Sequence, residues 1–364
     1  MAAAETSGQH NLAIADGIHR RSVVIDGLVV SKWGRDVFEA LHAAGVTAAN
    51  CTCCVWENFA ETMANIGTFY SWLDEHADII RLVRTAADIQ ASKKEKRVGI
   101  ILGFQNTSSI EDKLGRLRLY KELGVGIIQM TYNTQNLAGA GCYEPRDSGL
   151  SGFGHALLAE MNRIGIVVDL SHVGAQTSRE IIMASSKPVV YSHIAPAALK
   201  QHPRNKSDEE IRFLTSQGGF VGVTPFPWFL ANGNDSTLED YLDAIDYVVA
   251  IAGENNVGIG TDFMEGHGPE FVEWIMRDKG YGRPLVDISD ILQPTFPKGI
   301  ATIREFPHVT EAMVSRGWPA ARIEKIIGKL ASSSPRGVGR LKFCVAGSSA
   351  AAICGTTASS GEAV

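Results

Sequence analysis

Short apolar runs recur along the chain and are separated by segments of helical periodicity. The runs are rich in β-branched residues and do not alternate strictly, which is typical of parallel strands buried on both faces. Eight strands are predicted, near residues 22–27, 46–51, 98–104, 126–131, 166–170, 189–192, 220–224 and 257–260. Helical segments between them, such as residues 153–162, imply a parallel sheet, and eight such units favour a single (β/α)8 barrel of the TIM type. An open doubly wound sheet is the alternative, but no Gly-x-Gly-x-x-Gly fingerprint follows the first strand.

Length and composition fit one barrel domain rather than two domains. The chain has 364 residues, of which 45% are hydrophobic, and is divided into an extension at residues 1–20, a barrel with helices at 21–331 and a Ser/Ala/Gly-rich tail at 332–364. The net charge of −6 does not indicate a nucleic-acid partner, because proteins that bind nucleic acid usually carry an excess of basic residues. We expect a cytoplasmic protein with no membrane partner, because the first 17 residues lack a signal-peptide pattern and no run is long enough to cross a bilayer. Cys51, Cys53 and Cys54 fit free thiols in a reducing compartment.

Three predicted strands end in polar residues that can carry chemistry. His172 and His193 each follow an apolar run, and a third run ends in Asp262. The C-terminal strand ends of a (β/α)8 barrel converge on one site. Two imidazoles and a carboxylate that converge there form a candidate metal-assisted or acid–base site.

Four short motifs follow one another along the chain, namely Asp-Leu-Ser-His at 169–172, Ser-His at 192–193, His-Pro-Arg-Asn at 202–205 and Gly-Ile-Gly-Thr-Asp-Phe at 258–263. They resemble successive motifs of the membrane (renal) dipeptidase family, whose members are barrel-fold zinc hydrolases related to the amidohydrolases. Segments at 306–307, 316–318 and 323–328 resemble the C-terminal helices of that family. The resemblance runs from about residue 24 to 328 and implies a metal-dependent-hydrolase-like barrel with C-terminal helices.

The resemblance also implies roles for individual residues. His172 and His193 stand where the family ligates one zinc of a two-zinc site. Arg204 stands where the family clamps the substrate carboxylate, and a guanidinium fork suits that task. Asp262 stands where a carboxylate contacts the other metal and handles the proton of the attacking water.

Departures from the family pattern affect the same site. The family's first strand supplies a His-x-Asp ligand pair, whereas this chain has Leu28 and Val30. The family's bridging Glu is replaced by Gln105, whose neutral amide bridges two cations poorly. Tyr132 stands where some members carry a histidine, and its phenol can donate to a developing oxyanion. Its neighbour Asn133 is assigned with it to substrate binding.

Three interpretations of the function remain open. The first is a dipeptidase-like hydrolase of a small amide or dipeptide-like substrate with a carboxylate, with one zinc per chain held by His172, His193 and an oxygen of Gln105 or Asp262. The second is an enzyme without metal, a tautomerase, isomerase or lyase. In it, an acid–base group is formed by Asp262, His172, His193 and Tyr132, and Arg204 holds an acidic substrate. The third is an inactive homologue that binds a ligand. A homodimer is implied by the resemblance alone. His267 follows a strand end and is interpreted as a solvated loop histidine. Glu57 and Glu144 are interpreted as loop carboxylates, and replacement of a lost ligand by either is the alternative.

Overall fold

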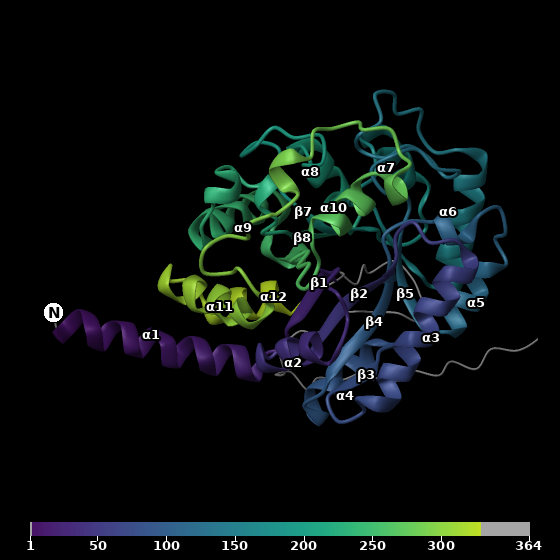
Figure 1. Ribbon diagram of the computed structural model, residues 1–364. Helices are drawn as coiled ribbons and strands as arrows, with labels where there is room; N and C mark the ends of the chain where they lie inside the picture. Colours follow the sequence, from purple (N-terminus) through teal and green to yellow (C-terminus); the bar gives the residue numbers. More distant parts are fainter. Residues whose placement is uncertain (1, 329–364) are drawn as a thin grey trace, which may run out of the picture.

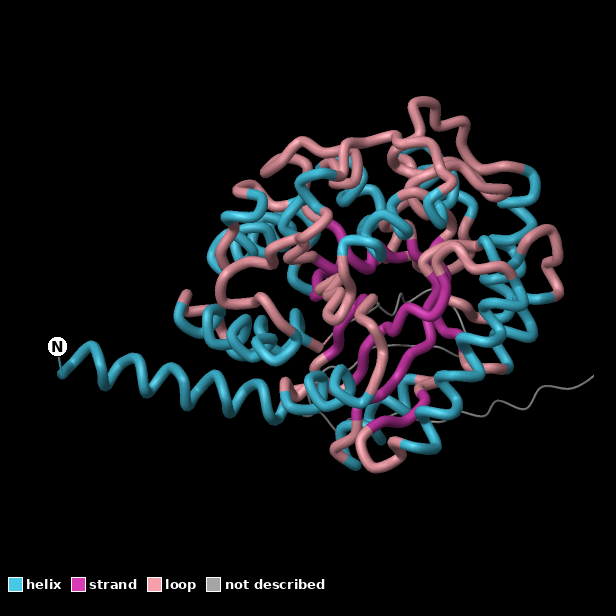
Figure 2. Tube along the Cα trace, viewed as in Figure 1, coloured by secondary structure: helices cyan, strands magenta, loops and turns pink. Residues whose placement is uncertain are grey.

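Eight strands follow one another in a nearly closed parallel sheet in the computed structural model, which describes residues 2–328 (Figures 1 and 2). The order is β1-β2-β4-β5-β6-β7-β8-β9, and β3 pairs with β4 off this path. The strands are β1 Ile25–Val29, β2 Ala48–Cys54, β3 Ile80–Leu82, β4 Val98–Phe104, β5 Val125–Gln129, β6 Val167–Asp169, β7 Val190–Ile194, β8 Phe220–Val223 and β9 Val257–Ile259. This confirms the predicted (β/α)8 barrel and its eight strands.

The first and last strands close the barrel through backbone contacts just beyond β9. A parallel bridge joins Val29 to Phe263, and the Asp262 amide donates to the Leu28 carbonyl at 2.9 Å. The buried Asp26 carboxylate reinforces this seam by accepting from the Thr261 amide at 2.8 Å and from its hydroxyl at 2.6 Å. Closure excludes the open-sheet alternative.

Helices cover the outside of the barrel (Figure 2). They are α1 Ala2–Arg21, α2 Arg35–Ala43, α3 Phe59–Glu75, α4 Ala86–Glu95, α5 Arg116–Glu122, α6 Gly152–Ile164, α7 Ala175–Ala184, α8 Asp208–Ser216, α9 Leu238–Ala252, α10 Pro269–Met276, α11 Phe306–Ser315 and α12 Ala320–Ile327. Short 3₁₀ turns lie at Ser108–Ile110, Pro227–Phe229, Gly233–Asp235, Glu254–Asn256, Asp278–Gly280, Ser289–Ile291 and Ile303–Glu305. Helix α6 covers the segment predicted at 153–162, and α11 and α12 are the expected C-terminal helices.

Local sequence explains where several of these helices begin. Asn58 and Glu61 form a capping box at α3, and Ser207 and Glu210 form one at α8. Helix α9 buries residues at helical spacing against the barrel, including Tyr241, Ile245 and Val248, while its other face stays polar. Among the described residues, no helix is both long enough and apolar enough to span a bilayer. The tail predicted at 332–364 lies outside the described residues.

Three glycines inside the barrel make room for the strand that carries His193. A Cβ atom on Gly222 or Gly260 would stand 2.0 Å from the Ser192 carbonyl oxygen, and one on Gly27 would stand 2.7 Å from it. These distances are shorter than any real contact, so only glycine permits β1, β8 and β9 to approach β7 so closely. The packing of the barrel interior therefore fixes the backbone at His193.

Helix α1 extends away from the barrel in Figure 1 and docks by its C-terminal part. The buried His19 joins α1 to α11 through a 2.8 Å contact between its Nδ1 and the Thr310 hydroxyl. Its Nε2 lies 2.8 Å from the Ala44 carbonyl at the end of α2. Burial lowers the pKa of His19 below its usual value, against the opposing effect of the Ala44 carbonyl.

We predict that acid weakens the docking of α1. A histidine pKa that is lower in the folded state gives stability that is present above the unfolded pKa of about 6.5 and is lost as pH falls below it. The free energy of unfolding should therefore decline between pH 7 and 5 more steeply in the wild type than in His19→Asn. The difference in slope should reach up to about 1.4 kcal/mol per pH unit, the limit for one proton. Equal slopes in urea titrations of the two proteins would contradict this, and His155→Asn, on an exposed face of α6, is the control.

Candidate functional site

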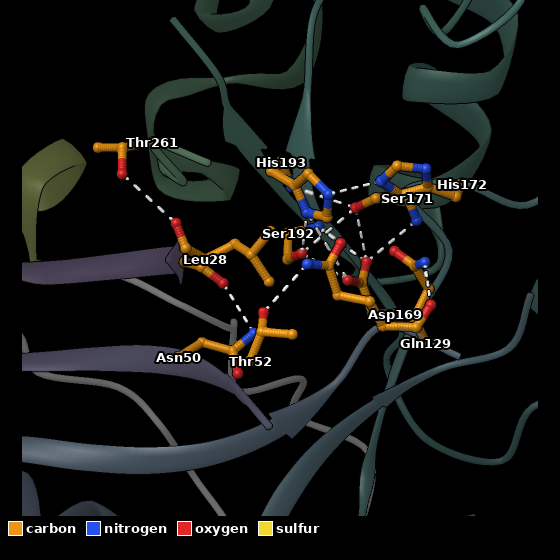
Figure 3. Close-up of polar contacts among 12 residues, drawn as sticks. Leu28, Asn50, Thr52, Gln129, Asp169, Ser171, His172, Ser192, His193 and Thr261 are labelled. Atoms are coloured by element: carbon orange, nitrogen blue, oxygen red, sulfur yellow. Dashed lines mark hydrogen bonds and ion pairs between the residues drawn. The ribbon is translucent and has the colours of Figure 1, made fainter. Parts of the chain in front are cut away.

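Two neighbouring strands bring His172 and His193 together at the C-terminal face of the barrel (Figure 3). His172 lies in the turn after β6, and His193 lies within β7. Their Nε2 atoms are 2.9 Å apart, and both side chains are buried. The structure therefore confirms that the two predicted histidines converge.

Neighbouring side chains fix how these two imidazoles are protonated. The Nδ1 of His172 lies 2.7 Å from the Asn133 Oδ1, which can only accept, so this Nδ1 carries the proton. The Nδ1 of His193 lies 2.7 Å from the Ser192 hydroxyl, which already donates to the Asp169 carboxylate. This Nδ1 therefore donates as well, and both Nε2 atoms are left with lone pairs.

Two lone pairs that face each other at 2.9 Å repel unless a cation lies at them. A proton is disfavoured in that position, because burial holds the pKa of both histidines well below the usual value and the Arg204 guanidinium adds to the effect. Neutral imidazole nitrogens oriented through their Nδ1 hydrogen bonds are typical zinc ligands. The donor set at this position fits one metal ion.

The residues expected to complete a metal site are arranged less favourably. The Gln105 amide donates from Nε2 to the Thr52 hydroxyl at 3.0 Å, and its Oε1 is buried without a hydrogen-bond partner. Within residues 2–328, no three side chains of the His, Cys, Asp and Glu types gather closely enough to hold a metal ion. Asp262 therefore does not join the two histidines in such a cluster. Leu28 and Val30 are buried apolar side chains, as their sequence implied.

Arg204 is fully buried in the loop between β7 and α8, and most of its guanidinium donors lack hydrogen-bond partners. Its Nη2 donates to the His193 carbonyl at 2.7 Å, and its guanidinium lies 5.4 Å from the centre of the Phe229 ring. Its Nε and Nη1 have no hydrogen-bond partner. A buried cation with unused donors next to a histidine is the arrangement expected of an anion-binding residue.

Asp262 and Tyr132 lie within electrostatic range of Arg204. Burial raises the pKa of Asp262 to about 7, although the Arg204 charge opposes the rise. The Tyr132 ring stacks on His172, with centroids 4.1 Å apart and planes at 21°. Asp262 and Asn133 have φ angles of +58° and +60°, values that side-chain-bearing residues rarely adopt and that often mark functional sites.

Several neighbours of the site were not predicted from the sequence. Ser171 and Ser192 both donate to Asp169, which thereby orients the His193 strand. Lys206 is buried and donates to the Val173 carbonyl at 2.7 Å. Nothing in the sequence predicted that Lys206 is buried. A lysine two residues after an arginine is an ordinary loop sequence, and burial of its side chain depends on tertiary packing. The Asp-x-Ser-His spacing was visible in the sequence, but its proton arrangement was not.

The three loop residues set aside in the sequence analysis do not replace lost ligands. Glu57 accepts from the backbone amides of Val55 at 2.7 Å and Trp56 at 3.1 Å. Glu144 accepts from the Gln135 amide at 2.9 Å. His267 stacks on Phe271 with centroids 3.5 Å apart.

Comparisons with known proteins agree with this fold. A family model described as membrane dipeptidase (peptidase family M19) matches residues 34–286, a segment that begins after Leu28 and Val30. Dipeptidase aclJ from Aspergillus oryzae is 29% identical over 269 residues, which cover 71% of this chain and 64% of that protein. The chain thus matches less than two thirds of this relative's length.

Two solved structures are also similar. A structure described as an amidohydrolase from Pseudomonas aeruginosa is 51% identical, covers 86% of this chain and 95% of its own, and has a TM-score of 0.84. The probable dipeptidase PvdM from Pseudomonas aeruginosa is 17% identical, covers 88% of this chain and 96% of its own, and has a TM-score of 0.75. This second likeness concerns the fold alone.

Proposed function

The chain belongs to the membrane dipeptidase family, peptidase family M19, and on that premise we propose that it hydrolyses a small amide or dipeptide-like substrate that bears a carboxylate. The observation that carries the proposal is Arg204, a buried guanidinium with two unused nitrogens directly behind His193. A substrate carboxylate would accept hydrogen bonds from this guanidinium and neutralise the buried charge. Similarity to a protein named as a dipeptidase and to a structure described as an amidohydrolase supports the hydrolytic reaction.

His172 and His193 would hold the metal through their facing Nε2 atoms. Gln105, which replaces the family's bridging Glu, would offer its Oε1, an oxygen that has no hydrogen-bond partner in the protein. One zinc ion there would act as a Lewis acid and lower the pKa of the attacking water. Arg204 would fix the carboxylate end of the substrate, and Tyr132 would donate its phenol to the carbonyl oxygen of the scissile bond. Asp262 would take a proton from the attacking water and return it to the leaving amine.

A metal-free acid–base enzyme, such as a tautomerase, isomerase or lyase, is the second candidate. The lack of a three-residue His/Cys/Asp/Glu cluster in the described part of the chain favours it. In that case Asp262 and Tyr132 would move protons on a substrate that Arg204 holds. We also propose that the metal is zinc, with one ion per chain. A homodimer and a cytoplasmic location are further proposals.

Isotope labelling separates the two candidates. With a panel of dipeptides and N-acyl amino acids in ¹⁸O-water, hydrolysis should place one labelled oxygen in the new carboxylate, and activity should disappear on chelation and return with zinc. The contrary outcome is product with solvent deuterium on carbon, no labelled oxygen and full activity in chelator. In that outcome Asp262→Asn should be the most damaging substitution, because it removes the base.

A further inference from the structure

A cavity of about 390 Å³ lies at the β1 and β2 side of the barrel mouth, between the ends of these strands and helices α3 and α10 (labels in Figure 1). Its walls carry an unusual share of aromatic rings, namely Trp33, Phe69, Trp72, Phe271 and Trp274. A volume of this size falls within the range of small-molecule sites, roughly 300–1,000 Å³. Nothing in the proposed hydrolytic chemistry uses these residues.

The cavity adjoins the candidate site through two side chains. Val30, which replaces a family metal ligand, lines the cavity, so the substitution that removes a carboxylate also makes this wall apolar. Thr52 also lines it and accepts a hydrogen bond from Gln105. In the view of Figure 3, Leu28 and Thr52 lie on the other side of His193 from His172.

An apolar cluster continues this wall to the histidine pair. Val30 and Val55 pack in one cluster with Trp56 and Tyr132, and the Tyr132 ring stacks on His172. The Trp56 and Tyr132 rings meet edge to face, with centroids 5.5 Å apart. A ligand group in the cavity would therefore rest against Val30 and Val55, which belong to the same apolar cluster as the ring that covers His172.

The charged groups of the cavity wall indicate an uncharged occupant. Glu57 accepts backbone and Asn65 hydrogen bonds and has no need of a ligand cation. Burial lowers the pKa of His267, which favours its neutral form. Lys32 is exposed and borders the cavity with its flexible stem. The remaining surface combines the aromatic rings with small neutral side chains such as Val55, Cys53 and Cys54, and the ring faces and edges favour a flat apolar group.

We propose that this cavity binds a planar aromatic group, of one or two fused rings, on the substrate. The proposal rests on the proposed hydrolytic function and names its substrate class. Arg204 follows β7, whereas the cavity lies at β1 and β2 across the mouth. With the carboxylate at Arg204, the aromatic group belongs to the acyl side of the scissile bond, and the substrate is an aromatic acyl derivative of a small amino acid.

A matched pair of probes tests the cavity. Zinc-supplemented protein should bind 1-naphthylacetyl-glycine about 100-fold more tightly than acetyl-glycine in titration calorimetry, since burial of two fused rings removes a large apolar area from water. Equal affinities would overturn the proposal.

Two substitutions on one helix provide the matched variants. Thr68 and Ser71 are both exposed on α3, and their hydroxyls donate to the carbonyls of Ala64 and Gly67 at 3.1 and 3.3 Å. Thr68 lines the cavity, so Thr68→Trp should fill it and abolish the naphthyl preference, whereas Ser71→Trp should keep it. Trp274→Ala removes one of the aromatic rings that line the cavity and should also abolish the preference for the naphthyl ligand. Retention of the full preference in both Thr68→Trp and Trp274→Ala would overturn the proposal.

A second probe separates failure of the cavity from failure of the hydrolytic function. 2-Naphthol has neither a carboxylate nor an amide bond, so its binding depends on the cavity alone. Binding that is lost in Thr68→Trp but kept in Ser71→Trp supports the cavity even if no acyl-glycine is hydrolysed, which would reject the hydrolytic function. Hydrolysis of acetyl-glycine and its naphthyl analogue at equal kcat/KM, with no 2-naphthol binding, rejects the cavity and leaves the hydrolytic function in place.

Discussion

Alanine at either His172 or His193 should eliminate zinc binding and turnover together. The wild-type chain should retain at most one equivalent of zinc after dialysis, and each variant should retain none. Each should lose more than about 100-fold in kcat/KM, the upper end of the cost of losing a residue that merely orients a ligand. Metal analysis of protein purified without chelator, followed by zinc titration, measures the stoichiometry.

The physical reason is the proton arrangement of the pair. The Nδ1 of His172 donates to Asn133, and the Nδ1 of His193 donates to Ser192. The two Nε2 atoms therefore both keep a lone pair, and they face each other at a distance of 2.9 Å. Removal of one imidazole leaves a single protein nitrogen, which cannot hold zinc tightly. Ser192→Ala should have a graded effect, a loss of about 10–100-fold in zinc affinity, because the Nδ1 of His193 loses its acceptor.

The exposed His155 on α6 supplies the control, since His155→Ala should bind metal as the wild type does. Two equivalents of tightly bound metal in the wild type would mean that ligands other than these histidines build a second site. Zinc retained by the double variant His172→Ala/His193→Ala would remove the pair from the metal site altogether. No metal in the wild type, even after added zinc, would favour the acid–base candidate.

The sequence was sufficient to predict the barrel because its strands are buried on both faces and therefore appear as continuous apolar runs. The eight predicted runs all overlap observed strands. The ninth strand, β3 Ile80–Leu82, was missed because Arg81 at its centre interrupts the apolar run by which the other strands were recognised. The length of α1 was also missed, since the residues 1–20 were treated only as an extension and docking through His19 depends on contacts with α2 and α11.

The candidate site was predicted in part for a comparable reason. Strand ends converge in a barrel, so the meeting of His172 and His193 followed from topology. The protonation of the pair did not follow, because it depends on which atom Ser192 donates to. The aromatic cavity was also beyond sequence reasoning, since Trp33, Trp72 and Trp274 come from three separate segments and show no common pattern along the chain.

Arg204→Met should make the protein more stable while it destroys substrate binding. Burial of a guanidinium with only one hydrogen bond is costly in the free protein, and a methionine of similar length removes that cost. We expect the free energy of unfolding in urea to rise by about 1–3 kcal/mol. The KM for a carboxylate-bearing substrate should rise by about 100-fold or more, because the charge-assisted pair with the substrate is lost. Arg204→Lys should keep the charge but lose the fork, with an intermediate KM.

Lys206, a second buried cation two residues away, gives the matched contrast. Its ammonium donates to the Val173 carbonyl, lies 3.6 Å from Glu210 and stands 5.0 Å from the centre of the Tyr191 ring. Because these partners depend on it, Lys206→Met should lower the free energy of unfolding by about 2–4 kcal/mol, the usual cost of breaking a buried charge network. Its KM should stay near the wild-type value. If Arg204→Met instead lost several kcal/mol of stability with an unchanged KM, then Arg204 would be a structural cation like Lys206, and the substrate carboxylate would have to be held elsewhere.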